Sequence, residues 1–118
     1  MNSSTPHDNR TLACLADARD SAAAILEWTS GVTFAEYQHR RQLRRAVERE
    51  FEIIGESLRR LRDANEETWE ALPDARRIVA FRNRLAHGYD TVDDALVWGI
   101  IQDHLPQCVR ELDTLLER

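Results

Sequence analysis

Apolar residues recur every three or four positions along most of the chain, with polar residues between them. This spacing places the apolar side chains on one face of a helix, so it predicts amphipathic α-helices. No stretch alternates apolar and polar residues as a half-buried strand does. The first helical pattern follows Asp8 or Asn9, either of which can cap a helix, and it ends at Ser30 and Gly31.

The second pattern opens with Thr33-Phe34-Ala35-Glu36, where a hydroxyl and a carboxylate three residues apart form a capping box. This box predicts the start of the longest helix, which runs to about Arg62. Its apolar stripe consists of Leu43, Val47, Phe51, Ile54, Leu58 and Leu61. The polar segment 63–65 breaks the pattern, and residues 66–72 predict one short helical turn.

Two further helices are predicted in the second half of the chain. Pro73 suits the first position of a helix that ends at Gly88, because proline lacks the N–H that a first turn leaves unused. Thr91, with Asp94 three residues later, predicts the start of the last helix. Pro106 falls inside this helix and predicts a kink there.

These patterns predict an all-α fold, an up-and-down bundle of four main helices and one short helix. A length of 118 residues fits one domain, expected over residues 8–118 after a flexible tail formed by residues 1–7. No apolar run approaches the roughly 18 residues that cross a bilayer. The polar N-terminus lacks the apolar centre of a signal peptide, so we expect a cytoplasmic protein without membrane contact.

The two cysteines give no sign of a disulfide or a metal site. Cys14 and Cys108 lie far apart in helical stretches, and neither belongs to a CxxC or a cysteine–histidine spacing. We expect both to be reduced core residues, and we expect the protein to need no metal and no cofactor.

The net charge of −5 argues against a protein that coats nucleic acid by bulk charge. A local basic site remains compatible with it, and all 16 positive side chains are arginine. Four of these arginines lie within Gln38–Arg45, a segment without an acidic residue. This segment is either a solvated helix face, a rim that binds RNA, or a contact for a partner protein.

The strongest candidate for chemistry is the segment Arg82-Asn83-Arg84-Leu85-Ala86-His87-Gly88-Tyr89. Histidine transfers protons near neutral pH, and arginine binds a phosphate and stabilises charge that develops on it. Arg82 and His87 are five positions apart, about 140° around a regular helix, so one copy of the pair does not converge directly. They converge through the long arginine side chain, through fraying near Gly88, or across a dimer interface.

A purely structural interpretation of this segment is also open. In that case His87 caps its own helix, Arg82 lies on the surface and Tyr89 packs on the bundle. An arginine–histidine spacing alone occurs often by chance in a chain with 16 arginines and 4 histidines. The tyrosine two residues after the histidine makes the combination much rarer.

The residues of this segment resemble the HepT-like branch of the HEPN superfamily. The resemblance also includes Leu72-Pro73, Val92-Asp93, Val97-Trp98, Leu105-Pro106, and the segments 46–49 and 51–58. It extends over roughly residues 8 to 116 and shows no departure at Arg82, His87 or Tyr89. Glu52 and Glu56 resemble family positions, but they are equally compatible with a solvated face or with arginine partners.

The resemblance implies a homodimeric ribonuclease toxin of a type II-like toxin–antitoxin module that cleaves RNA without a metal. Its composite site would be formed by Arg82 and His87 of both protomers at the dimer cleft. His87 would move a proton at the ribose 2′-hydroxyl or the leaving oxygen, Arg82 would bind the phosphate, and Asn83 would orient these groups. The implied substrate is RNA, with tRNA and mRNA both open.

The resemblance further implies a partner protein, a minimal nucleotidyltransferase antitoxin of the MntA-like kind. It would silence the toxin by AMPylation of Tyr89, which places a bulky anion beside the arginines. Two alternatives remain open at this stage. One is a non-catalytic nucleotide-binding or regulatory subunit of a nucleotidyltransferase, and the other is a purely structural helical dimer.

Overall fold

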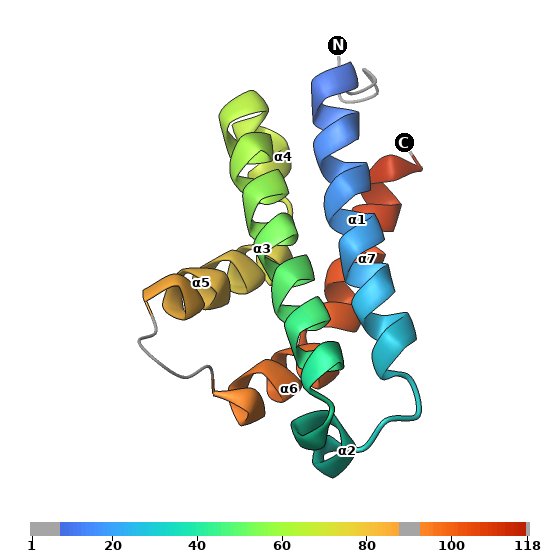
Figure 1. Cartoon of the computed structure of the whole chain (residues 1–118). Helices are drawn as coiled ribbons and strands as arrows, with labels where there is room; N and C mark the ends of the chain where they lie inside the picture. Colours follow the sequence, from blue (N-terminus) through green and yellow to red (C-terminus); the bar gives the residue numbers. More distant parts are fainter. Residues whose placement is uncertain (1–7, 88–92, 118) are drawn as a thin grey trace.

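The all-α prediction is confirmed by a computed structural model of the chain, which describes residues 8–87 and 93–117, without the side chains of 82–87 (Figure 1). Its helices are α1 (Asn9–Thr29), α2 (Phe34–His39), α3 (Arg41–Ala64), α4 (Glu66–Glu70), α5 (Pro73–His87), α6 (Asp94–Asp103) and α7 (Leu105–Leu116). The predicted tail, residues 1–7, lies outside the described residues. Within the described part of the chain, none of the helices is long and apolar enough to cross a membrane.

Helix α1 begins and ends where the sequence predicts. The side chain of Asp8 accepts a hydrogen bond from the Thr11 N–H at 2.8 Å, so Asp8 is the N-cap. The helix ends before Ser30, and Gly31 then adopts a φ of +76°. Glycine suits this left-handed conformation because it has no Cβ to clash with the backbone.

The second predicted helix is divided into two in the structure. The Thr33 capping box is present, with Glu36 bonding back to the Thr33 N–H at 2.9 Å, but α2 ends at His39. Arg40 leaves the helical conformation, with φ −104° and ψ 85°, and α3 begins after it. The break turns α2 toward α6, where the buried Tyr37 ring packs 5.2 Å from the Trp98 ring. Tertiary burial of an aromatic side chain thus overrides a continuous helical pattern.

The last predicted helix is also divided into two, and its start is shifted. Asp93, and not Thr91, caps α6, because its carboxylate accepts from the Leu96 N–H at 3.1 Å. The expected kink at Pro106 is a complete break at His104, which separates α6 from α7. Pro106 lies in the first turn of α7, where its missing N–H costs no hydrogen bond and its ring meets no preceding turn.

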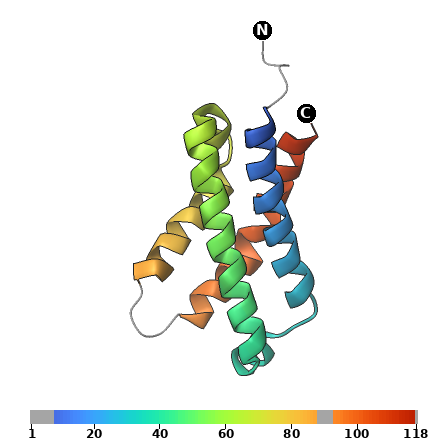
Figure 2. The same cartoon turned by 45° about the horizontal axis from the view of Figure 1, so that its top comes forward.

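The core forms where α1 packs along both α3 and α7, an arrangement visible in Figures 1 and 2. Helix α5 packs against α3 and α7, and its later part points away from α1 in both views. The fully buried large side chains are Leu15, Ile25, Tyr37, Phe51, Ile54, Leu58, Leu61, Leu72, Ile78, Phe81, Ile101 and Leu105. Cys14 and Cys108 are free and buried, as predicted. This core fixes α5, the helix that carries the candidate catalytic residues.

Candidate active site on α5

Helix α5 contains three of the four predicted site residues. Arg82, Asn83 and His87 lie in its last six positions, directly after Phe81. Their side chains are outside the described residues, and so is the whole of Tyr89. Phe81 is only 2% exposed, and its ring meets the Phe51 ring of α3 edge-on at 5.3 Å. The core therefore fixes the backbone of α5 up to the position immediately before Arg82.

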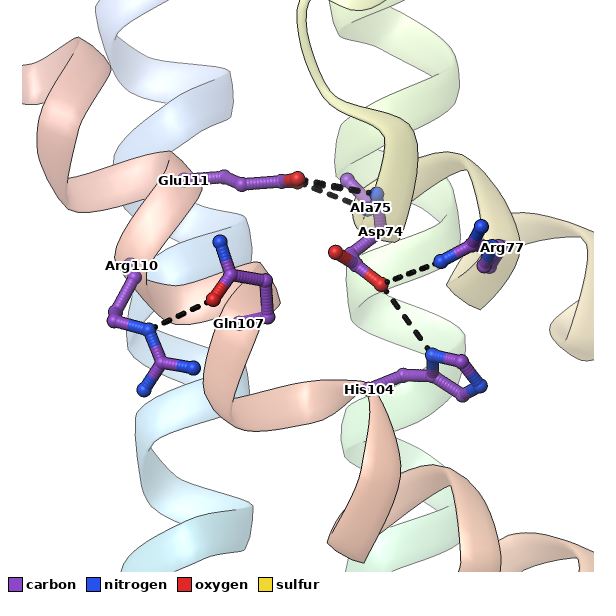
Figure 3. Close-up of polar contacts among 7 residues, drawn as sticks. All are labelled: Asp74, Ala75, Arg77, His104, Gln107, Arg110 and Glu111. Carbon is purple, nitrogen blue, oxygen red and sulfur yellow. Dashed lines mark hydrogen bonds and ion pairs between the residues drawn. The ribbon is translucent and has the colours of Figure 1, made fainter.

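The start of α5 is held by a residue from another helix (Figure 3). The carboxylate of Glu111, on α7, accepts hydrogen bonds from the Asp74 N–H at 3.2 Å and the Ala75 N–H at 3.3 Å. These N–H groups belong to the first turn, where a helix has no partners of its own. A negative charge there is also favoured by the helix dipole. Glu111 thus acts as an N-terminal cap of α5, supplied across the bundle.

A second set of contacts surrounds the same helix end (Figure 3). The Asp74 carboxylate contacts Nδ1 of His104 at 3.3 Å and accepts from the Arg77 guanidinium at 3.0 Å. His104 lies at the break between α6 and α7, so this contact ties that break to α5. The position of His104 at this break, in contact with Asp74, supports a structural role for its side chain. Together with Glu111, these groups connect α5, α6 and α7 through polar contacts.

Burial raises the pKa of two groups near this network. The pKa of Glu111 is raised because its carboxylate is partly removed from water, an effect that outweighs the lowering by the two N–H donors. The nearby charge of Asp74 raises it further. Burial also raises the pKa of the Cys108 thiol to about 12, which makes it an inert core group.

The first turn of α6 is linked to α3 by charge. Asp94 lies 3.9 Å from the Arg44 guanidinium, and Arg44 also donates to the Gln38 carbonyl. Glu48, one turn further along α3, has a raised pKa because it is partly buried, and Asp94 adds to the effect. The helix that follows the candidate segment is thus attached to the α2–α3 junction.

Two other predicted positions have ordinary surface partners. Glu52 pairs with Arg49 at 3.1 Å and Glu56 pairs with Arg59 at 3.0 Å, each within α3. The interpretation of these acids as arginine partners is therefore confirmed. Across residues 8–87 and 93–117, no three histidine, cysteine, aspartate or glutamate side chains are grouped as metal ligands.

Sequence patterns alone do not reveal the roles of Glu111 and Asp74. They are 37 residues apart, and neither lies in a motif. The one local signal is the absence of a Ser, Thr, Asp or Asn directly before Pro73, where Leu72 stands. A helix start without its own cap requires an acceptor from elsewhere, but a sequence pattern does not say which residue supplies it.

The chain matches a known protein family along most of its length. A family model described as Ribonuclease HepT-like matches residues 18–115. The chain belongs to this HepT-like family. The matched range runs from α1 to α7 and includes the segment from Arg82 to Tyr89. Family membership thus confirms the resemblance inferred from that segment.

Other HepT-like relatives match along most of their length. A Methanocaldococcus jannaschii protein named as a putative RNase is 32% identical over 101 residues, which cover 86% of this chain and 92% of the relative. A Caldanaerobacter subterraneus protein, also named as a putative RNase, is 27% identical over 94 residues, or 80% of this chain and 83% of the relative. No solved structure matches the chain significantly.

Proposed function

We propose that this chain is the ribonuclease toxin of a toxin–antitoxin module and that it cleaves RNA without a metal. The observation that carries the proposal is the family match over residues 18–115, which includes the complete Arg82–Tyr89 segment. The relatives are named as putative RNases, and these names support the same reaction class. The backbone of α5 supports it further, because Arg82 and His87 lie on one helix that is anchored in the core.

The proposed reaction needs one proton-transfer group and one phosphate-binding group. The ribose 2′-oxygen attacks the adjacent phosphorus, and the bond from phosphorus to the 5′-oxygen breaks. His87 moves a proton at the 2′-hydroxyl or at the leaving oxygen. Arg82 binds the phosphate and stabilises the charge that develops on it, and Asn83 orients these groups.

Two protomers are proposed to form one site. Arg82 and His87 are about 140° apart around a regular helix, so two copies can surround one phosphate more readily than one copy. In a homodimer with two-fold symmetry, the segments of both copies face one cleft. One phosphate is then surrounded by groups from both chains.

A nucleotidyltransferase antitoxin is the proposed regulator. The Tyr89 oxygen attacks the α-phosphorus of ATP, pyrophosphate leaves, and the tyrosine proton passes to solvent. The AMP group that remains on Tyr89 carries a negative charge beside Arg82 and Arg84. It therefore competes with the substrate phosphate for the same guanidinium groups.

The decisive test is digestion of total RNA and tRNA by the purified chain in excess EDTA. We expect cleavage by the wild-type protein and loss of at least about a hundredfold in rate for His87→Ala and for Arg82→Ala. Circular dichroism checks that both variants remain helical, and Arg59→Ala serves as an exposed control. Intact RNA with the wild-type protein, combined with nucleotide binding, would support a non-catalytic regulatory subunit instead.

Mixing the two inactive variants tests the composite site. A mixed dimer of Arg82→Ala and His87→Ala chains retains one arginine and one histidine, so part of the activity should return after subunit exchange. Activity that never returns, although mixed dimers form, would mean that each protomer works alone.

For Tyr89, the intact mass of the protein after incubation with the antitoxin and ATP should show one added AMP group. The Tyr89→Phe variant should show no added mass.

A further inference from the structure

The α2–α3 junction presents three arginines to solvent. Arg40, Arg41 and Arg45 are all exposed, and we call these three residues the basic surface. The surrounding segment, Gln38–Arg45, contains no acidic residue although the whole chain carries a net charge of −5. The positive charge is therefore concentrated locally in an acidic protein.

Ion pairing separates the basic surface from five other arginines, although Arg60, Arg62 and Arg110 also have no ion pair within the described residues. Arg44, its half-buried neighbour, lies against Asp94 and Gln38. Arg40, Arg41 and Arg45 make no ion pair with any residue in the described ranges 8–87 and 93–117. By contrast, Arg19, Arg49, Arg59, Arg76 and Arg77 each contact a carboxylate.

The fold places this surface next to the helix that follows the candidate catalytic segment. Helix α2 packs on α6 through Phe34 and Tyr37, whose rings lie 6.1 and 5.2 Å from the ring of Trp98. The Arg44–Asp94 contact joins α3 to the first turn of α6. Asp94 is only seven positions after His87 in the sequence. The α2–α3 junction that carries the basic surface therefore contacts the helix that follows the candidate segment in the sequence.

We propose that Arg40, Arg41 and Arg45 bind backbone phosphates of the RNA substrate. This inference rests on the proposed function and assigns it a substrate-binding surface. Planar guanidinium groups bind phosphate oxygens in pairs, and cationic side chains that neutralise phosphates are the main source of affinity for nucleic acid. The remaining side chains of the segment are mostly polar, whereas the centre of a protein–protein interface is apolar. RNA therefore fits this surface better than a protein partner does.

The test compares two variants that lose the same charge. One is Arg40→Gln/Arg41→Gln/Arg45→Gln, and its matched control is Arg59→Gln/Arg60→Gln/Arg110→Gln, which removes three other exposed arginines. For cleavage of a single-stranded RNA, the first variant should raise KM about tenfold at moderate salt and change kcat by less than about twofold. Its plot of log KM against log salt should be shallower by about 2, because single strands contribute about 0.7 per phosphate contact. The control should change neither quantity.

Further measurements separate the possible failures. Arg40→Lys/Arg41→Lys/Arg45→Lys keeps the charge, so its salt dependence should match that of the wild type. Fluorescence anisotropy with the His87→Ala protein reads RNA binding without cleavage, so it tests the surface even if the chain proves not to be a nuclease. Equal KM, affinity and salt dependence in the Gln variant and its control would overturn the proposal. If only neutralisation by the antitoxin were lost, the surface would belong to that protein.

Discussion

Helix α5 and the basic surface use charged groups in opposite ways. At the start of α5, the Glu111 carboxylate accepts hydrogen bonds from backbone N–H groups. The Asp74 carboxylate there contacts Arg77 and His104. At the α2–α3 junction, Arg40, Arg41 and Arg45 have no ion-pair partner in the part of the chain that the structure describes. Charges that are bonded within the chain contribute to its stability, whereas exposed charges without an ion pair are available to a ligand.

This difference separates anchoring from binding. The first part of α5 has to hold its position, because the candidate catalytic residues follow it directly on the same helix. The basic surface has to stay open to bind a phosphate chain. We therefore expect changes in α5 to reduce stability and changes at the basic surface to leave it intact.

The largest expected effect is that of Phe81→Ala. This change removes a buried ring that packs edge-on against Phe51, so it should lower the free energy of unfolding by about 3–5 kcal/mol. Urea denaturation followed by circular dichroism measures the loss, and Phe81→Leu should recover much of it. A loss below about 1 kcal/mol would contradict the view that the core anchors α5.

Removing the cap of α5 should have the next largest effect. Glu111→Ala leaves the N–H groups of Asp74 and Ala75 without their acceptor, so we expect a loss of about 2 kcal/mol. Thermal unfolding measures it, and Thr114→Ala, an exposed change one turn along α7, is the control. RNA cleavage should fall as well if the position of α5 governs the site. Unchanged stability would mean that water replaces Glu111 at no cost.

The pH dependence of the cap gives a smaller and more specific effect. The pKa of Glu111 is raised in the folded protein, so its folded form holds a proton that the unfolded chain releases. Stability is then greatest below the ordinary glutamate pKa of about 4.3 and falls as the pH rises through the raised value. Glu111→Gln cannot ionise and lacks this fall. The stability of the wild type relative to Glu111→Gln should therefore decline over that pH window, and a rise would reverse the assignment.

The smallest expected effect is on the other side of the comparison. Arg40→Gln/Arg41→Gln/Arg45→Gln should change the free energy of unfolding by less than about 0.5 kcal/mol, because these exposed side chains lack ion pairs among the described residues. Urea denaturation under the conditions used for Phe81→Ala gives the direct comparison. A loss above about 1 kcal/mol would assign the three arginines to the scaffold.

Local sequence signals determined most of the helices and the location of the candidate site. Helix starts depend on contacts within one helical turn, so neighbouring residues are enough to predict them. Examples are the caps at Asp8 and Thr33, the short helix after Asn65, and Pro73 at the first position of α5. The segment Arg82-Asn83…His87-Gly88-Tyr89 identified the family for the same reason, since its residue types and spacing are local.

Only the tertiary structure decided where the long helical patterns divide and what holds α5. The break at Arg40 follows from burial of Tyr37 against Trp98, more than 60 residues away in the sequence. The cap from Glu111 likewise crosses 37 positions of the chain. Such contacts form between residues that only folding brings together, and helical periodicity contains no information about them. The sequence by itself thus determined which residues are candidates for chemistry, and the packing of distant helices decided how the helix that carries them is held.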